Sequence, residues 1–128
     1  MKLLLDTCSF LWIGEGSSKL SAAASLAFLD PENERYLSAA SVWEICIKHS
    51  NGKLPLPAHP QFYISQLRER VGVAPLPIDE ESALHVAKLP SLHGDPFDRI
   101  LIAQSIVHGL TILTPDPLVT SYPARTLW

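Results

Sequence analysis

Short apolar runs alternate with longer segments of helical periodicity along this chain. The short runs have the length and composition of strands that are buried on both faces of a parallel sheet. The third run holds two prolines, which favours a short strand there. The pattern predicts four strands and a short fifth one, at Leu3–Asp6, Tyr36–Ser38, Val73–Ile78, Leu110–Leu113 and Arg125–Trp128.

The segments between these runs carry the start and stop signals of helices. The clearest is the segment after Gly94, where Asp95 is placed as N-cap, Pro96 as the first helical residue and Gly109 just past the end. The predicted helices are Thr7–Ile13, Leu20–Leu29, Ser41–Ser50, Gln61–Val71, Glu80–Leu89 and Pro96–His108.

Alternating strands and helices predict an α/β fold with a central parallel sheet of four to five strands flanked by helices. The length of 128 residues predicts a single domain over residues 1–128, and 47% hydrophobic residues suffice for a packed core. We expect a cytoplasmic protein with no membrane contact, because no apolar run has the length of a signal peptide or a membrane span. Cys8 and Cys46 are then expected to be reduced thiols.

Four carboxylates follow predicted strands or begin predicted helices: Asp6, Glu44, Asp98 and Asp116. In a parallel sheet the strand ends and the following helix starts share one edge, which is where ligands bind. Clustered carboxylates repel one another, and a divalent cation is the usual way to neutralise them. The pattern therefore indicates a metal site built from oxygen ligands.

Each of these acids also has an ordinary structural explanation. Asp6 could cap the helix that follows it. Ser41 and Glu44 fit a capping box, and Asp116 lies between two prolines in a turn. These alternatives remain open for each residue taken alone, but four unrelated caps facing one edge form a less common pattern. Beside Asp98, the sequence assigns the cap to Asp95, although Asp95 could also join the metal site.

The other chemically active residues point less clearly to a function. The net charge of −3 argues against a general nucleic-acid coat but is compatible with a nuclease. Lys48 and Arg99 are the cations nearest the acids, and we interpret both as salt-bridge or solvated partners. Trp12 and Trp43 are expected in the core, with base stacking as the alternative.

The sequence resembles the PIN-domain ribonucleases, in particular the VapC-type toxins of type II toxin–antitoxin systems. The resemblance covers nearly the whole chain in the order and spacing of that family. The block from Asp95 to Arg99 is fairly specific, whereas the start alone would be a weak signal. The matching segments are LLDT at 4–7, SVWEICIK at 41–48, NGKL at 51–54, DPFDRILIAQ at 95–104 and GLTILTPD at 109–116.

The resemblance implies a PIN-like three-layer fold and an endoribonuclease that depends on Mg²⁺, with Mn²⁺ as a substitute ion. It also implies an RNA substrate, inhibition by a cognate antitoxin protein, and a homodimer. By motif position Asp6, Glu44 and Asp98 match the three core acids of the family, and Asp116 matches its more variable fourth. The sequence departs from the pattern at Cys8, where similar toxins often carry histidine.

Two other classes of protein remain as alternatives. A phosphatase of haloacid dehalogenase type also begins with an apolar strand that ends in aspartate, but it needs a second aspartate where this chain has Cys8. A non-catalytic α/β interaction domain would bind no metal. Cleavage of RNA in the presence of Mg²⁺, Mn²⁺ or EDTA separates these possibilities.

Overall fold

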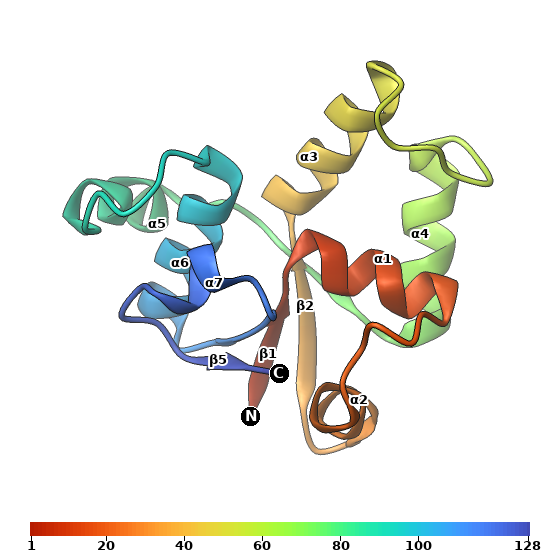
Figure 1. The fold of residues 1–128 in the computed structure, drawn as a ribbon, viewed down its shortest axis with the longest axis horizontal. Helices are drawn as coiled ribbons and strands as arrows, with labels where there is room; N and C mark the ends of the chain where they lie inside the picture. Colours follow the sequence, from red (N-terminus) through yellow and green to blue (C-terminus); the bar gives the residue numbers. More distant parts are fainter.

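A computed structural model describes residues 1–128 and has a five-stranded parallel sheet at its centre (Figure 1). The strand order is β3-β2-β1-β4-β5, with β1 in the middle and every neighbouring pair parallel. The strands are β1 at Lys2–Leu5, β2 at Glu34–Ser38, β3 at Ala74–Leu76, β4 at Thr111–Leu113 and β5 at Thr126–Leu127.

Seven α-helices and one 3-10 helix connect the strands. None of the helices combines the length and the apolar character needed to cross a membrane. The helices are α1 at Thr7–Glu15, α2 at Ala22–Leu29, α3 at Ala39–Ser50, α4 at Pro60–Val71, α5 at Glu80–His85, η1 at Val86–Lys88, α6 at Pro96–His108 and α7 at Pro117–Thr120.

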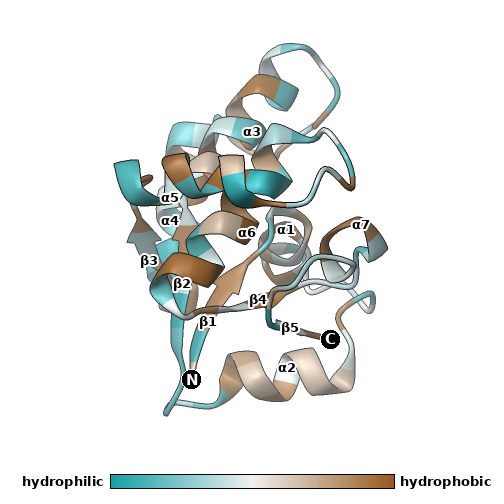
Figure 2. Cartoon of the chain, turned by 90° about the vertical axis from the view of Figure 1, so that its left-hand side faces the viewer, coloured by the Kyte–Doolittle hydropathy of each residue, from teal (hydrophilic) through white to brown (hydrophobic).

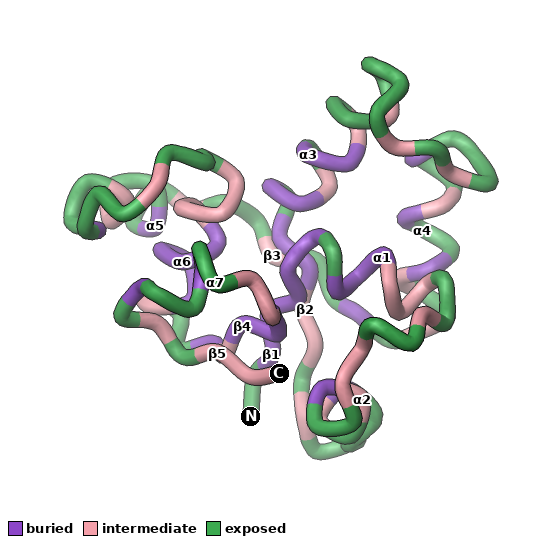
Figure 3. The backbone as a smooth tube through the Cα atoms, in the orientation of Figure 1, coloured by how far each residue is buried: buried purple, intermediate pink, exposed green.

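The sheet separates two hydrophobic cores. In β1 successive side chains point to opposite faces, so Leu4 packs in one core and Leu5 in the other, and both are fully buried. The core around Leu5 lies beneath α1, α3 and α4, and the core around Leu4 lies beneath α6 and α7. Figure 2 shows hydrophobic residues on the central strands, and Figure 3 shows that much of β1 and β4 is buried.

The predicted α/β class and parallel sheet are confirmed, with small changes at the ends of elements. The helix expected at 80–89 ends earlier and continues as η1, and the helix expected at 41–50 begins at Ala39. A short helix that the sequence did not predict, α7, follows β4. These differences bear on the site, because α3 contains Glu44 and Asp116 caps α7.

Candidate active site

The four acids lie at the carboxyl-terminal edge of the sheet, as predicted. Asp6 directly follows β1, and Asp116 follows the neighbouring strand β4. Glu44 is in α3, which begins where β2 ends, and Asp98 is in the first turn of α6. In Figure 1 the starts of α1 and α3 lie at the end of β1 opposite to the amino terminus of the chain.

Asp6 serves as a helix cap and also lies within the acidic edge. Its Oδ1 accepts a hydrogen bond from the backbone N–H of Ser9 at 2.7 Å, which caps α1. The residue is only 7% exposed. Burial raises the pKa of Asp6, and the charge of Asp116 raises it further, against hydrogen bonds from Thr114 and Ser9 that lower it. The carboxylate is therefore held in one orientation in a place that disfavours its charge.

The capping box predicted for α3 is wrong. Ser38, not Ser41, is the N-cap, and its hydroxyl accepts from the backbone N–H of Ala40 at 3.0 Å. The Ser41 hydroxyl is buried without a hydrogen-bond partner. Because the helix begins earlier than predicted, Glu44 lies beyond its first turn and is not needed for capping.

Glu44 is instead bound by two side chains. Its Oε1 accepts from the Thr7 hydroxyl at 2.6 Å, and its Oε2 pairs with the Lys48 ammonium at 2.6 Å. The ion pair predicted for Lys48 is thus confirmed, and Glu44 raises the pKa of Lys48. The pair keeps Glu44 in place beside the start of α1 while only 7% of the residue is exposed.

Asp95 is the N-cap of α6, as the sequence predicted. Asp95 Oδ1 caps α6 by accepting from the backbone N–H groups of Phe97 at 2.8 Å and Asp98 at 3.2 Å. The Asp98 side chain takes no part in capping, and its Oδ2 lies 3.1 Å from His93 Nε2. Burial raises the pKa of Asp98, and the charges of Asp95 and Asp116 add to this effect.

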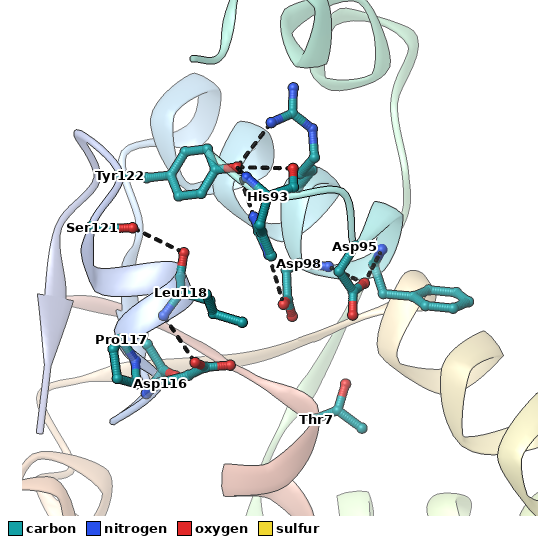
Figure 4. Close-up of polar contacts among 12 residues, drawn as sticks. Thr7, His93, Asp95, Asp98, Asp116, Pro117, Leu118, Ser121 and Tyr122 are labelled. Carbon is teal, nitrogen blue, oxygen red and sulfur yellow. Dashed lines mark hydrogen bonds and ion pairs between the residues drawn. The ribbon is translucent and has the colours of Figure 1, made fainter. Parts of the chain in front are cut away.

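Asp116 is the N-cap of α7, where the sequence predicted a turn or a site residue. Its Oδ1 accepts from the backbone N–H of Leu118 at 3.0 Å, and its own N–H donates to the Thr114 hydroxyl at 3.1 Å. In Figure 4 the carboxylates of Asp98 and Asp116 approach a common space from two sides, with Thr7 below it. The effect of Asp116 on the pKa of both Asp6 and Asp98 fits this arrangement.

The negative charges of the acidic edge also affect the pKa of the Cys8 thiol. Loss of hydration, followed by the negative charges of Asp6, Glu44 and Asp116, raises its pKa to about 11, although Lys48 opposes this. At neutral pH Cys8 is therefore a protonated thiol and a poor nucleophile. Both cysteines are free, as predicted.

The donor chemistry of the edge fits a hard, hydrated cation. No three His, Cys, Asp or Glu side chains converge closely enough to enclose an ion by themselves. Zn²⁺ needs such a closed set, commonly with sulfur or imidazole ligands. Mg²⁺ keeps several waters and is commonly bound directly by only one or two carboxylates. Separated aspartates at one edge suit Mg²⁺ better than Zn²⁺.

The structure adds polar residues that the sequence analysis did not identify. Thr7 binds Glu44, and His93 and Tyr122 stand behind Asp98 (Figure 4). Arg99 forms no ion pair, which was one of the two roles predicted for it, and its guanidinium donates to Tyr122 Oη and to backbone carbonyls. Only Thr7 had a local signal, because it directly follows Asp6.

The core position predicted for Trp43 is wrong. Trp43 is 60% exposed, and its ring meets that of Phe97 edge-on with centroids 5.2 Å apart. Trp12 is partly buried and packs against Trp128 at 5.6 Å. Trp43 and Phe97 directly precede Glu44 and Asp98 in the sequence, so the aromatic contact joins the two helices that contain these acids.

Known proteins share both the sequence pattern and the fold. The profile of the PIN domain matches residues 3–120. Ribonuclease VapC22 of Mycobacterium tuberculosis is 30% identical over 123 residues, which cover 94% of this chain and 91% of that protein.

Two solved structures have the same fold over nearly the full length. VapBC2 from Rickettsia felis, bound to a DNA fragment from the promoter, has a TM-score of 0.72 at 14% identity and covers 99% of this chain and 98% of its own. VapBC-1 from nontypeable Haemophilus influenzae has a TM-score of 0.66 at 17% identity, with 99% and 97% covered. The profile match and the curated relative establish that this chain belongs to the PIN domain family.

Proposed function

We propose that this protein is a Mg²⁺-dependent endoribonuclease, with Mn²⁺ as a substitute ion, and that it is the toxin of a toxin–antitoxin pair. The main support is the acidic edge, where burial and the charge of Asp116 together raise the pKa of both Asp6 and Asp98. Such perturbed carboxyl groups are typical of functional sites. The curated relative is a ribonuclease by name, which supports the choice of RNA as substrate.

In this proposal Asp6 and Asp98 hold the cation. Asp116 holds its water shell or a second ion. When bound, the cation polarises a phosphate oxygen and lowers the pKa of a water molecule. Glu44 orients the attacking water, with Thr7 and Lys48 fixing the position of its carboxylate.

The aromatic pair beside the acids supports contact with unpaired RNA. Bases of single-stranded RNA stack on aromatic side chains without strict sequence preference. Trp43 offers an exposed ring, and Phe97 supports it edge-on. We expect Trp43→Ala to raise KM for RNA more than it lowers kcat, because the ring lies beside the acids rather than among them.

We also propose an antitoxin partner and a homodimer. The two full-length structural neighbours are VapBC pairs by name. The acidic edge has the charge needed to accept a basic side chain of a partner. Light scattering of the protein, alone and with the product of its genomic neighbour, tests both statements. A strict monomer in both samples contradicts them.

The alternatives have less support. The position that a haloacid dehalogenase phosphatase needs for its second aspartate is Cys8, whose thiol is protonated at neutral pH. A non-catalytic interaction domain gives no reason for an acidic edge at which the loss of hydration raises the pKa of Asp6 and Asp98.

Cleavage of single-stranded RNA with Mg²⁺, Mn²⁺ or EDTA tests the proposed function. We expect activity with either ion, none with EDTA, and none for Asp6→Asn. The matched control is Asp79→Asn, because Asp79 caps α5 through the N–H of Ser82 just as Asp6 caps α1. Asparagine caps as well as aspartate, so both variants keep their helices. Activity that persists in EDTA, or in Asp6→Asn at the level of the control, refutes the proposal.

A further inference from the structure

His93 lies between Asp98 and Tyr122 and contacts both side chains. It is in the loop before α6, and its side chain is 11% exposed. Nε2 is 3.1 Å from Asp98 Oδ2, and Nδ1 is 2.7 Å from the hydroxyl oxygen of Tyr122 (Figure 4). Tyr122 is buried in the core beneath α6, so the histidine is held from behind by a rigid part of the fold.

The partners of Tyr122 determine which way these hydrogen bonds run. Its oxygen accepts from Arg99 Nη1 at 2.9 Å and from the backbone N–H of His93 at 3.2 Å. Two acceptors lie within reach of the hydroxyl proton, His93 Nδ1 at 2.7 Å and the His93 backbone oxygen at 3.4 Å. Donation to the nearer one, Nδ1, leaves the hydrogen of a neutral ring on Nε2. A protonated ring also carries a hydrogen there. Nε2 therefore donates to Asp98 Oδ2 in both states.

We propose that His93 is a positioning residue for the metal ligand Asp98, and that Tyr122 and Arg99 fix His93 in turn. The bond from Nε2 occupies Oδ2 and fixes the rotation of the carboxylate, so that Oδ1 is presented to the acidic edge. Hydrogen bonds of this kind to ligating groups orient them, and their loss typically weakens metal affinity by about 10–100-fold. This inference rests on the proposed metal site.

The chain contains a matched pair outside the site. His108, at the other end of α6, places its Nε2 2.8 Å from Asp79 Oδ1, away from the four acids. The two pairs share the same chemistry and the same helix. Replacing His108 therefore controls for the general effect of losing a histidine–aspartate contact.

The experiment measures Mn²⁺ binding by calorimetry on the full chain without RNA. His93→Leu removes the donor, whereas His93→Gln places an amide N–H close to the position of Nε2. We expect the Kd for Mn²⁺ to rise about 10–100-fold in His93→Leu, to stay within a few-fold of wild type in His93→Gln, and to rise by less in Tyr122→Phe than in His93→Leu. His108→Leu should bind as wild type does. Melting temperatures in EDTA show whether each variant folds.

Each outcome decides the question. Wild-type affinity in a folded His93→Leu, or equal losses in His93→Leu and His93→Gln, overturns the positioning role while leaving the metal site in place. If His93→Leu does not fold, Tyr122→Phe decides. Unchanged affinity of that variant for Mn²⁺ overturns the proposal that Tyr122 and His93 position Asp98. Absence of Mn²⁺ binding by the wild type overturns the proposed metal site itself, and this inference with it.

Discussion

The two ends of α6 carry the same pair of residue types in different surroundings. At the amino-terminal end His93 contacts Asp98, with 11% and 20% of the two side chains exposed. At the carboxyl-terminal end His108 contacts Asp79, with 37% and 34% exposed. The pKa of Asp98 is raised above its usual value, whereas hydrogen bonds from His108 and Ser82 lower the pKa of Asp79 far below it.

Burial explains why the two aspartates shift in opposite directions. Asp98 lies in the first turn of α6, where the helix dipole favours a negative charge. Its pKa nevertheless rises, because the loss of hydration and the charges of Asp95 and Asp116 outweigh the histidine. Asp79 keeps much of its hydration and has no such acidic neighbours among the causes of its shift. A histidine–aspartate pair thus stabilises charge at the surface, but it cannot fully do so in a desolvated acidic cluster.

The largest expected effect is a difference in RNA cleavage between variants of Asp98 and of Asp79. If Asp98 holds the cation, Asp98→Asn should lower RNA cleavage by at least about a hundredfold, the upper end of what loss of a supporting residue costs. The melting temperature of this variant should also stop rising with Mn²⁺, because an ion stabilises only a native state that binds it. Asp79→Asn should keep both properties. Equal Mn²⁺ stabilisation of both variants removes Asp98 from the metal site.

The same comparison shows what the sequence can reveal. Asp95, Pro96 and Gly109 predicted both ends of α6 correctly, because capping depends on residues within one turn of the helix. The central strands β1 and β4 were equally visible, because a strand buried on both faces is apolar over most of its length. Local patterns are therefore sufficient to place the four acids at one edge of the sheet.

The contacts of His93 with Tyr122 and of His108 with Asp79 join residues that are far apart in the sequence. His93 and Tyr122 are 29 positions apart, as are Asp79 and His108, and no local pattern marks either pair. The error at Ser41 has a related cause: two serines could each cap α3, and the position where β2 ends selects Ser38. The exposure of Trp43 was missed because an aromatic residue on an apolar helix is usually buried.

A smaller effect should appear in the stability of the protein without metal. Burial raises the pKa of Asp6, so its charged form destabilises the fold, and each pKa unit corresponds to about 1.4 kcal/mol. Asp6→Asn should therefore raise the melting temperature in EDTA by roughly a few degrees. Asp79→Asn should lower the melting temperature, because hydrogen bonds stabilise the charged form of Asp79. This decrease should be smaller than the increase in Asp6→Asn, because the Asp79–His108 pair is partly exposed to water.

Calorimetric melts of both variants in EDTA and in millimolar Mg²⁺ measure this contrast. Mg²⁺ should stabilise wild type and Asp79→Asn more than Asp6→Asn, because the proposed ligand is lost only in Asp6→Asn. A fall in the melting temperature of Asp6→Asn in EDTA, with equal stabilisation of all three proteins by Mg²⁺, makes Asp6 a structural cap alone.

The smallest expected effect is the pH dependence of these two differences, measured on metal-free protein. The folded-state pKa of Asp79 lies below the ordinary value of 3.8, so its stabilisation is fully present above that value and is lost as the pH falls through the lower folded-state pKa. The folded-state pKa of Asp6 lies above 3.8, so the cost of its charge is present above the folded-state value and disappears below 3.8. The advantage of Asp6→Asn should therefore vanish at a higher pH than the disadvantage of Asp79→Asn. Melting temperatures taken from neutral pH down to about pH 3 should show the advantage of Asp6→Asn disappear within this range, while most of the disadvantage of Asp79→Asn persists at its lower end. Loss of both differences over the same pH range would mean that burial does not distinguish the carboxyl groups.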